Sequence, residues 1–191
     1  STLDRSSAAS DVYKRQALSL VAPRPVSGMY TPQKNKVLDD WVVARRSRFH
    51  TAAIVSRHDG AAAMLRQLRA GVPFYTLPDM DFGLRSSRFI DFFGVPAATL
   101  DVAPRLAASA NARVYPVVTR ILPGARGYAI TVHPAWSDFP ALDEKGKPAD
   151  IDADLRRMNR FIEEQVRTMP AQYHWVHKRF KNRPEGEPSL Y

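Results

Sequence analysis

Apolar residues recur in two patterns along the chain, short runs typical of strands and longer amphipathic stretches typical of helices. The runs at 28–32, 52–56 and 74–77 predict strands, and the stretches at 37–49 and 60–70 predict helices, the second ending at Gly71. The arginines of the first helix are expected to face solvent and its apolar stripe to face the core. Because strand, helix and strand follow one another between 52 and 77, this region predicts a βαβ unit with parallel strands.

The second half of the chain predicts a longer series of elements. We expect a helix at 99–110, where Pro104 requires a late start or a kink. Strands are expected at 113–121 and 128–133, and a helix at 150–169 follows a polar loop at 139–149. The apolar face of that helix holds Leu155, Met158, Phe161, Ile162 and Val166. Together these elements predict an α/β domain with a central mixed, largely parallel sheet flanked by helices.

The first sixteen residues show neither helical periodicity nor strand alternation. We expect 1–16 to be a non-native or disordered leader and 17–191 to belong to a single domain. No apolar run approaches the ~20 residues that cross a bilayer. The 28 Lys and Arg residues exceed the 19 Asp and Glu residues, giving a formal net charge of +9. This charge favours a polyanionic partner: nucleic acid, an anionic membrane surface or a phosphorylated substrate. The absence of cysteine excludes disulfides, thiolate metal sites and a cysteine nucleophile.

The strongest chemical signal is a charged loop at 78–88, Pro-Asp-Met-Asp-Phe-Gly-Leu-Arg-Ser-Ser-Arg, directly after a predicted strand. Ligands of parallel sheets bind at the carboxyl ends of the strands, and the planar fork of arginine suits phosphate and carboxylate groups. The charged loop therefore predicts a site for an anionic oxygen ligand. Its candidate residues are Asp79, Asp81, Arg85, Ser86, Ser87 and Arg88.

Other interpretations of these residues are weaker. The Asp79-Met80-Asp81 pair supplies fewer oxygens than hard divalent cations usually require. Asp-Phe-Gly at 81–83 occurs in protein kinases, but no Gly-rich loop or His-Arg-Asp motif accompanies it here. His174 and His177 have helical spacing but no third ligand nearby, so we expect no metal and no cofactor. A solvated turn at 85–88 stays open as an alternative.

Two long motifs resemble one known family, in the same order. The run at 78–99 resembles the signature block of the bacterial lipid A biosynthesis acyltransferases, the late lauroyl and myristoyl transferases, and residues 169–181 with Arg183-Pro184-Glu185-Gly186 resemble that family's C-terminus. The resemblance covers 28–191. It implies a glycerolipid acyltransferase-like fold and the transfer of a fatty acyl chain from acyl carrier protein to a lipid A precursor, a phosphorylated glucosamine lipid. The expected location is the cytoplasmic face of the bacterial inner membrane.

The resemblance also implies roles for the charged loop. Arg85 with Ser86 would grip an acceptor phosphate, with help from Arg88, while Asp79 and Asp81 would position Arg85. The family carries a basic residue directly after the tyrosine of the 28–32 region, where this chain has Thr31. We expect the nearby Lys34 or Lys36 to replace that contact.

One family feature has no counterpart at its usual place. The family's catalytic base is a histidine in a His-x4-Asp/Glu motif upstream of the tyrosine region, which here is preceded only by the leader-like sequence. The formal match His133…Asp138 lies downstream of the charged loop, and Pro134 disfavours the helix start that would aim both side chains together. We interpret this match as coincidental. The chain is expected to be an N-terminally truncated fragment, the C-terminal two-thirds of an acyltransferase domain, inactive alone and anchored to the membrane, if at all, by a missing segment.

A non-catalytic peripheral module that binds anionic lipid stays open as a second class of function. The C-terminal tail, residues 169–191, interleaves aromatic residues with cations in the manner of an interfacial segment. These are Tyr173, Trp175 and Phe180 with Lys178, Arg179, Lys181 and Arg183. Nucleic-acid binding would use similar residues, but no nucleic-acid-binding signature accompanies them, so no nucleic-acid partner is expected.

Overall fold

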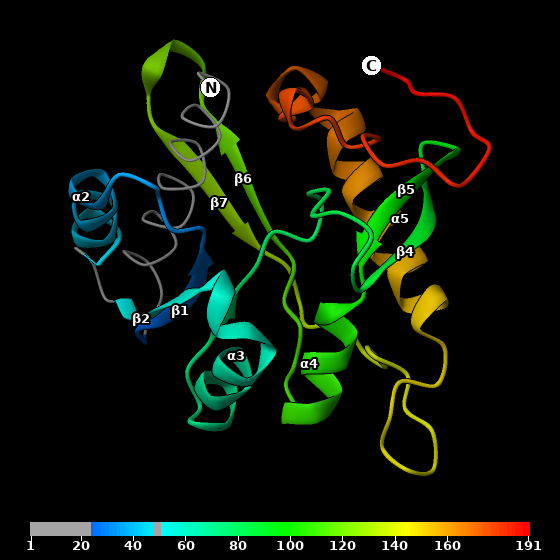
Figure 1. The fold of residues 1–191 in the computed structure, drawn as a ribbon, viewed down its shortest axis with the longest axis horizontal. Helices are drawn as coiled ribbons and strands as arrows, with labels where there is room; N and C mark the ends of the chain where they lie inside the picture. The colour runs from blue at the N-terminus through cyan, green and yellow to red at the C-terminus, as the bar shows by residue number, and fades with distance from the viewer. Residues whose placement is uncertain (1–23, 48–50) are drawn as a thin grey trace. The chain divides into compact units, whose positions relative to one another are not determined.

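The computed structural model describes residues 24–47 and 51–191 (Figure 1). The chain forms two compact units that divide between Thr76 and Leu77. We call the described residues before this point unit 1 and those after it unit 2. The leader predicted at 1–16 and the last two residues of the helix predicted at 37–49 lie outside the described residues.

Unit 1 contains a three-stranded parallel sheet. Its middle strand, β1 (Val26–Tyr30), pairs with β2 (Thr51–Ser56) on one side and with β3 (Phe74–Tyr75) on the other. The helix α3 (Gly60–Arg69) connects β2 to β3, after a short 3-10 turn η1 (Arg57–Asp59). The predicted βαβ unit with parallel strands is thus confirmed, although its last strand is only two residues long. The charged loop begins three residues after β3 in the sequence.

The first helix, α2 (Lys36–Arg46), begins where the Asn35 side chain accepts a hydrogen bond from the Leu38 backbone. Its predicted faces are only partly confirmed within the described residues, because Arg45 is exposed as predicted but other positions differ. Val37 is 79% exposed and Trp41 56% exposed, whereas Arg46 is buried. The exposed Trp41 ring lies beneath the Arg45 guanidinium, 5.5 Å from its centroid. The helix therefore buries Arg46 and leaves Val37 and Trp41 exposed, the reverse of the prediction at these three positions.

Unit 2 begins with a hairpin that the sequence did not predict. Strands β4 (Ser87–Phe92) and β5 (Val95–Leu100) pair antiparallel through a turn at Phe93 and Gly94, both with positive φ. Because β5 takes the residues up to 100, the helix expected at 99–110 starts late, as α4 (Val102–Ala110), with Pro104 in its first turn. The expected late start is confirmed. The start predicted at residue 99 is wrong.

A second hairpin follows α4. Strands β6 (Val117–Ile121) and β7 (Tyr128–Val132) pair antiparallel, with the turn η2 (Pro123–Ala125) between them. The strand predicted at 113–121 therefore forms only in its second half. The described residues hold one three-stranded parallel sheet and two two-stranded antiparallel sheets. The α/β class is confirmed, whereas a largely parallel central sheet is shown only in the small sheet of unit 1.

The long helix α5 (Ile151–Thr168) supports the first hairpin along its length (Figure 1). Asp150 caps it by accepting a hydrogen bond from the Ala153 backbone at 2.9 Å. Leu155 and Met158 pack with Ile90 of β4 to form the core of unit 2, which confirms the predicted apolar face. The chain then makes two short turns in the tail, η3 (Pro170–Gln172) and η4 (Trp175–His177).

Two polar side chains of α5 fix the hairpin in place. The Asn159 amide donates to the Asp91 carbonyl at 3.0 Å, and the Glu163 carboxylate accepts from the Phe93 backbone N–H at 2.8 Å. Asn159 is 1% exposed. A buried polar group without partners would be costly, so these contacts specify one position of the hairpin on the helix. The hairpin in turn holds the basic end of the charged loop, because Ser87 and Arg88 are its first residues.

The carboxyl group of Asp154 lies buried on the same helix, and we expect it to make the fold more stable at low pH. Burial, and to a smaller extent the charge of Asp150, raise its pKa above the ordinary 3.8, although the Ala141 backbone N–H partly opposes this. The folded state therefore retains a proton that the unfolded chain has already released. Stability should fall as pH rises from the unfolded-state pKa through the folded-state pKa.

Substituting Asp154→Asn should remove this pH dependence. Urea unfolding between pH 3 and pH 8 should show the variant gaining stability relative to the unmodified chain as pH rises, with the smallest difference at the acid end. Glu164→Gln, at an exposed position of the same helix, is the matched control and should give a nearly constant difference. A variant that loses stability relative to the unmodified chain at pH 8 would contradict the assignment.

Candidate functional site: a braced charged loop

The acidic half of the charged loop is anchored by Asp81. Its Oδ1 atom accepts hydrogen bonds from the Gly83 backbone N–H at 2.9 Å and from the Asn182 side-chain amide at 2.6 Å. Its Oδ2 atom accepts from the Asn182 backbone N–H at 2.9 Å. The first bond closes a tight turn in which Gly83 has a φ of 95°, a conformation that glycine adopts without strain. Asp81 thus joins the loop to the tail, about a hundred residues further along the chain.

The other acidic residue, Asp79, also faces the tail. Burial raises the pKa of the Tyr173 hydroxyl, and the negative charge of Asp79 and a hydrogen bond with it raise that pKa further. Burial lowers the pKa of the Arg179 guanidinium, while Asp79 and Asp81 both oppose this effect. The two carboxylates of the loop therefore counterbalance a buried cation of the tail.

The middle of the loop is fixed by hydrogen bonds to its own backbone and to the start of α4. The Ser87 hydroxyl donates to the Gly83 carbonyl at 2.7 Å, and the Asp101 backbone N–H donates to the Ser86 carbonyl at 3.0 Å. Ser86 has a φ of 58°, an uncommon value for a residue other than glycine. Such a backbone persists only where its surroundings hold it, which marks this turn as a candidate site.

The two arginines of the loop have different environments. Arg88 donates from Nη1 to the Asp152 carboxylate at 2.9 Å, and its Nε atom lies 3.9 Å from the Asp101 carboxylate. Arg85 is exposed and makes no hydrogen bond or ion pair with any residue that the structure describes. The structure does not bring Asp79 or Asp81 into an ion pair with Arg85, because both acids face the tail. Arg85 therefore stays the predicted ligand-binding cation of this loop.

The tail supplies a buried arginine where the sequence predicted an interfacial one. Arg179 is 2% exposed; it donates from Nη1 to the Ala98 carbonyl at 2.6 Å and from Nη2 to the Thr99 hydroxyl at 2.7 Å. Its guanidinium also lies 5.2 Å from the centroid of the Phe92 ring. The prediction that Arg179 faces a membrane is therefore wrong. Its two terminal nitrogens thus donate to polar groups of β5 that would otherwise be buried without a partner.

Other tail residues predicted to be interfacial also pack inside unit 2. The rings of Tyr173 and Phe180 lie 6.0 Å and 6.1 Å from that of Phe92. Arg183 donates to the Pro96 carbonyl at 2.7 Å, and its side chain is 9% exposed. The tail is thus an integral part of unit 2, and only some of its cations and aromatic residues reach solvent.

The predicted phosphate contact at Lys34 lies in unit 1. Lys34 is exposed in the segment between β1 and α2, and so is Thr31. Beside them, at the end of β1, burial and the charge of Asp39 raise the pKa of the Tyr30 hydroxyl. The structure describes each unit by itself, so a joint role for Lys34 and the charged loop stays a prediction.

The formal match to a catalytic pair is not assembled. The His133 ring packs edge-on against the Phe161 ring, with 5.1 Å between centroids, and its backbone N–H donates to the Pro116 carbonyl. Asp138 is exposed and has a φ of 51°. Within the part of the chain that the structure describes, no hydrogen bond or ion pair joins the two side chains. This geometry supports the interpretation that His133…Asp138 is a coincidental match.

The second histidine pair lies in the tail. The rings of His174 and His177 are 4.4 Å apart between centroids. Across residues 24–47 and 51–191, no three His, Asp or Glu side chains are placed together as a metal ion would require. In those same ranges, no helix combines the length and the apolar character needed to span a membrane.

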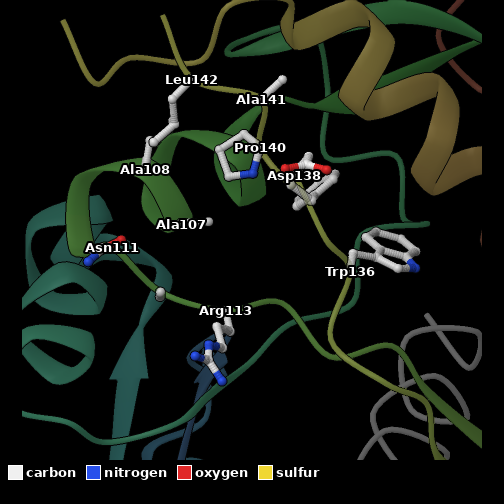
Figure 2. Close-up of a pocket in the computed structure, with 11 residues that line it drawn as sticks. Ala107, Ala108, Asn111, Arg113, Trp136, Asp138, Pro140, Ala141 and Leu142 are labelled. Atoms are coloured by element: carbon white, nitrogen blue, oxygen red, sulfur yellow. The ribbon is translucent and has the colours of Figure 1, made fainter. Parts of the chain in front are cut away.

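Unit 2 also contains an open cavity of about 770 Å³. Figure 2 shows that it is lined by α4 residues such as Ala107 and Ala108 and by the segment from Trp136 to Leu142. Arg113 and Asp138 contribute its charged side chains. None of the predicted site residues lines this cavity, so it is separate from the charged loop.

The sequence did not single out the residues that hold the loop from a distance. Asn182 and Asn159 belong to no recognised functional motif, and the sequence does not distinguish Arg179 from its exposed basic neighbours. The resemblance at 169–181 and 183–186 was the one signal that could have indicated the tail residues, because it marks the tail as a unit together with the loop, and it does not extend to Asn159.

The fold and the loop define a class of protein before any comparison. It is an α/β protein with an exposed arginine on a loop whose acidic residue Asp81 is held by the tail. Comparison with known proteins then identifies the family. Residues 16–182 match the family model described as bacterial lipid A biosynthesis acyltransferase, and the chain belongs to this family.

Three relatives show how far the similarity extends. The chain is 34% identical over 168 residues to the lipid A biosynthesis lauroyltransferase of Escherichia coli K12, covering 87% of this chain and 52% of the relative. It is 34% identical to the myristoyltransferase of the same organism (87% and 49%) and 30% identical to the palmitoleoyltransferase (88% and 52%). The relatives are named as acyl-transferring enzymes, which confirms the predicted family. The chain spans about half the length of these relatives.

Proposed function

We propose that this chain provides the acceptor-binding part of an enzyme that transfers a fatty acyl chain to a lipid A precursor. The observation that supports this most directly is the environment of Arg85, an exposed guanidinium on a loop whose neighbouring charges are all engaged. The acceptor would be a phosphorylated glucosamine lipid, and the donor an acyl carrier protein thioester. The proposed place of reaction is the cytoplasmic face of the bacterial inner membrane.

In this proposal some loop residues bind the phosphate and the others stabilise the conformation of the loop. Arg85 binds two oxygens of an acceptor phosphate with its planar fork, and the exposed Ser86 adds a hydroxyl donor. Ser87 and Arg88 stabilise the turn through Gly83 and Asp152. Asp79 and Asp81 hold the acidic half of the loop on the tail through Tyr173 and Asn182. Lys34 is the further candidate for a phosphate contact, from unit 1.

The catalytic base is not assigned to this chain. Acyl transfer to a hydroxyl requires a positioned base, and the separation of His133 from Asp138 does not provide one. We propose that the base belongs to a His-x4-Asp/Glu motif outside these 191 residues, in the part of the enzyme that the chain does not match. The proposed domain accordingly covers residues 17–191, with 1–16 as a leader.

A peripheral membrane surface forms the second part of the proposal. Trp175 and Val176 are 47% and 51% exposed on the turn η4, next to Lys178. An exposed aromatic and apolar pair beside cations suits the headgroup region of an anionic membrane. A non-catalytic role in binding anionic lipid rests on these same residues, so the experiment must separate surface binding from phosphate recognition.

We expect the chain to sediment with vesicles in the order phosphatidic acid, then phosphatidylserine, then phosphatidylcholine. Basic residues near an anionic surface contribute about 1 kcal/mol each, so the binding should weaken as salt increases. The preference for phosphatidic acid over phosphatidylserine should arise from the phosphate monoester, which offers Arg85 more free oxygens. Trp175→Ala should weaken binding to both anionic lipids alike. Equal binding to all three lipids, or binding indifferent to salt, would count against the proposal.

A further inference from the structure

The tail contacts the charged loop through groups that would not themselves touch a ligand. The Asn182 side chain and backbone both donate to the carboxylate of Asp81, at 2.6 Å and 2.9 Å. The Tyr173 hydroxyl interacts with Asp79. Each acidic residue of the loop therefore has a partner in the tail, and neither forms an ion pair with Arg85 among the residues that the structure describes.

The same tail segment is locked to the hairpin that follows the loop. Arg179 donates to the Ala98 carbonyl at 2.6 Å and to the Thr99 hydroxyl at 2.7 Å, and Arg183 donates to the Pro96 carbonyl at 2.7 Å. All three acceptors lie on β5, whose partner β4 begins inside the loop at Ser87. The tail thus contacts the loop at its acidic end and, through the hairpin, at its basic end.

Charge reinforces this arrangement. Arg179 is nearly fully buried, and an uncompensated buried guanidinium would be strongly destabilising. Asp79 and Asp81 are the loop carboxylates whose charges favour its protonated form. If the loop moved away from the tail, the buried cation would lose this compensation, so the electrostatics favour the observed contact between the loop and the tail.

We infer that Asn182, with Arg179, is a positioning residue that holds the charged loop in the conformation that binds the acceptor phosphate. This inference rests on the proposed role of Arg85. Asn182 ties the acidic side of the Gly83 turn to the tail, and Arg85 follows that turn by two residues. The two residues act on the ligand through the direction in which the loop presents Arg85.

The test measures binding of glucosamine 1-phosphate to the full 191-residue chain by NMR titration, with glucosamine as the probe that lacks phosphate. If Asn182→Ala leaves the competent loop conformation only about 10–30% populated, the apparent dissociation constant should rise about three- to tenfold. Asn182→Asp keeps the side-chain shape but places a second carboxylate against Asp81. It should weaken binding at least as much as the alanine variant.

Gln172→Ala is the matched control. Gln172 also belongs to the tail and also makes two long-range hydrogen bonds, but both go to Ile121 of β6. Its removal should lower the melting temperature by an amount similar to that for Asn182→Ala and leave the dissociation constant unchanged. Hydrogen exchange at Gly83 should accelerate in Asn182→Ala and not in Gln172→Ala. A general loss of stability would instead accelerate exchange at many residues in both variants.

The outcomes separate the inference from the proposed function. If Arg85→Lys weakens binding of glucosamine 1-phosphate but Asn182→Ala behaves like Gln172→Ala, the positioning role is wrong and the phosphate site stands. If the unmodified chain does not distinguish glucosamine 1-phosphate from glucosamine, or Arg85→Lys binds it as tightly, the phosphate site itself is wrong. Weaker binding in both Arg85→Lys and Asn182→Ala, with Gln172→Ala unchanged, supports both.

Discussion

Replacing Arg85 with lysine should abolish most of the acyl transfer supported by this chain, although the positive charge is kept. The proposed contact is a planar guanidinium that binds two phosphate oxygens at once, and an ammonium group supplies only a point charge. We expect a loss of about tenfold or more, equivalent to the ~1.4 kcal/mol or more that charge-assisted hydrogen bonds contribute. The lost contact should appear mainly in KM for the lipid acceptor if it is made equally in the ground and transition states.

The assay requires an enzyme that contains the whole catalytic machinery. A chimera in which residues 17–191 replace the matching part of the Escherichia coli lauroyltransferase provides it, because the similarity covers 168 residues of that relative. Arg160→Lys is the matched control, since Arg160 is exposed on α5 and makes no ion pair with the residues that the structure describes. Activity losses of similar size at both positions would remove the special role of Arg85.

The charged residues of this loop could be predicted from sequence, whereas the tail residues that hold the loop in place could not. The position of Arg85 after a short strand, the glycine at the turn and the density of charge in the loop are all readable in eleven consecutive residues. The partners of Asp79 and Asp81 are about a hundred residues away, and no local pattern encodes a contact of that range. The sequence thus led to the expectation that neighbouring charges pair with one another, while the structure pairs them with the tail.

The secondary-structure elements also differ in whether local sequence predicts them or long-range contacts are needed. The α5 helix and the strands of unit 1 have clear periodicity, and their predicted bounds lie within a few residues of those observed. The first hairpin was missed because Val95-Pro96-Ala97-Ala98-Thr99-Leu100 is rich in small residues and lacks alternation. Its strand is stabilised by tertiary contacts, from Arg179 and Asn159, which propensity does not reveal.

Burial in the tail was misjudged for a related reason. Lys178, Arg179 and Lys181 look alike in sequence, yet only Arg179 inserts its guanidinium between the Phe92 ring and the β5 backbone. Arginine can be buried where its donors are satisfied, and lysine far less readily. A basic and aromatic segment therefore combines buried and interfacial residues, and the exposed fraction of each side chain is needed to separate them.

The largest expected effect concerns the catalytic base. We expect the 191-residue chain alone to transfer no detectable acyl group from acyl carrier protein thioester, even where it binds glucosamine 1-phosphate and anionic vesicles. General-base assistance is typically worth ~10²–10⁴-fold, and activation of the acceptor hydroxyl depends on the same group. The histidine in the only formal match, His133, packs against Phe161 and makes no contact with Asp138 among the residues that the structure describes.

Four proteins test this expectation in one assay: the chain alone, the chimera with the lauroyltransferase, and each of these with His133→Ala. Activity should occur in the chimera and persist there after His133→Ala, apart from a modest loss of stability from the removed ring contact. The chain alone should remain at the uncatalysed rate. Turnover by the chain alone that disappears with His133→Ala would instead show that His133 acts as a relocated base, and it would overturn the proposal that the base lies outside these residues. The contact between His133 and Phe161 predicts the first result. The His133 ring packs edge-on against an aromatic ring and, among the residues that the structure describes, has no carboxylate partner to fix its tautomer.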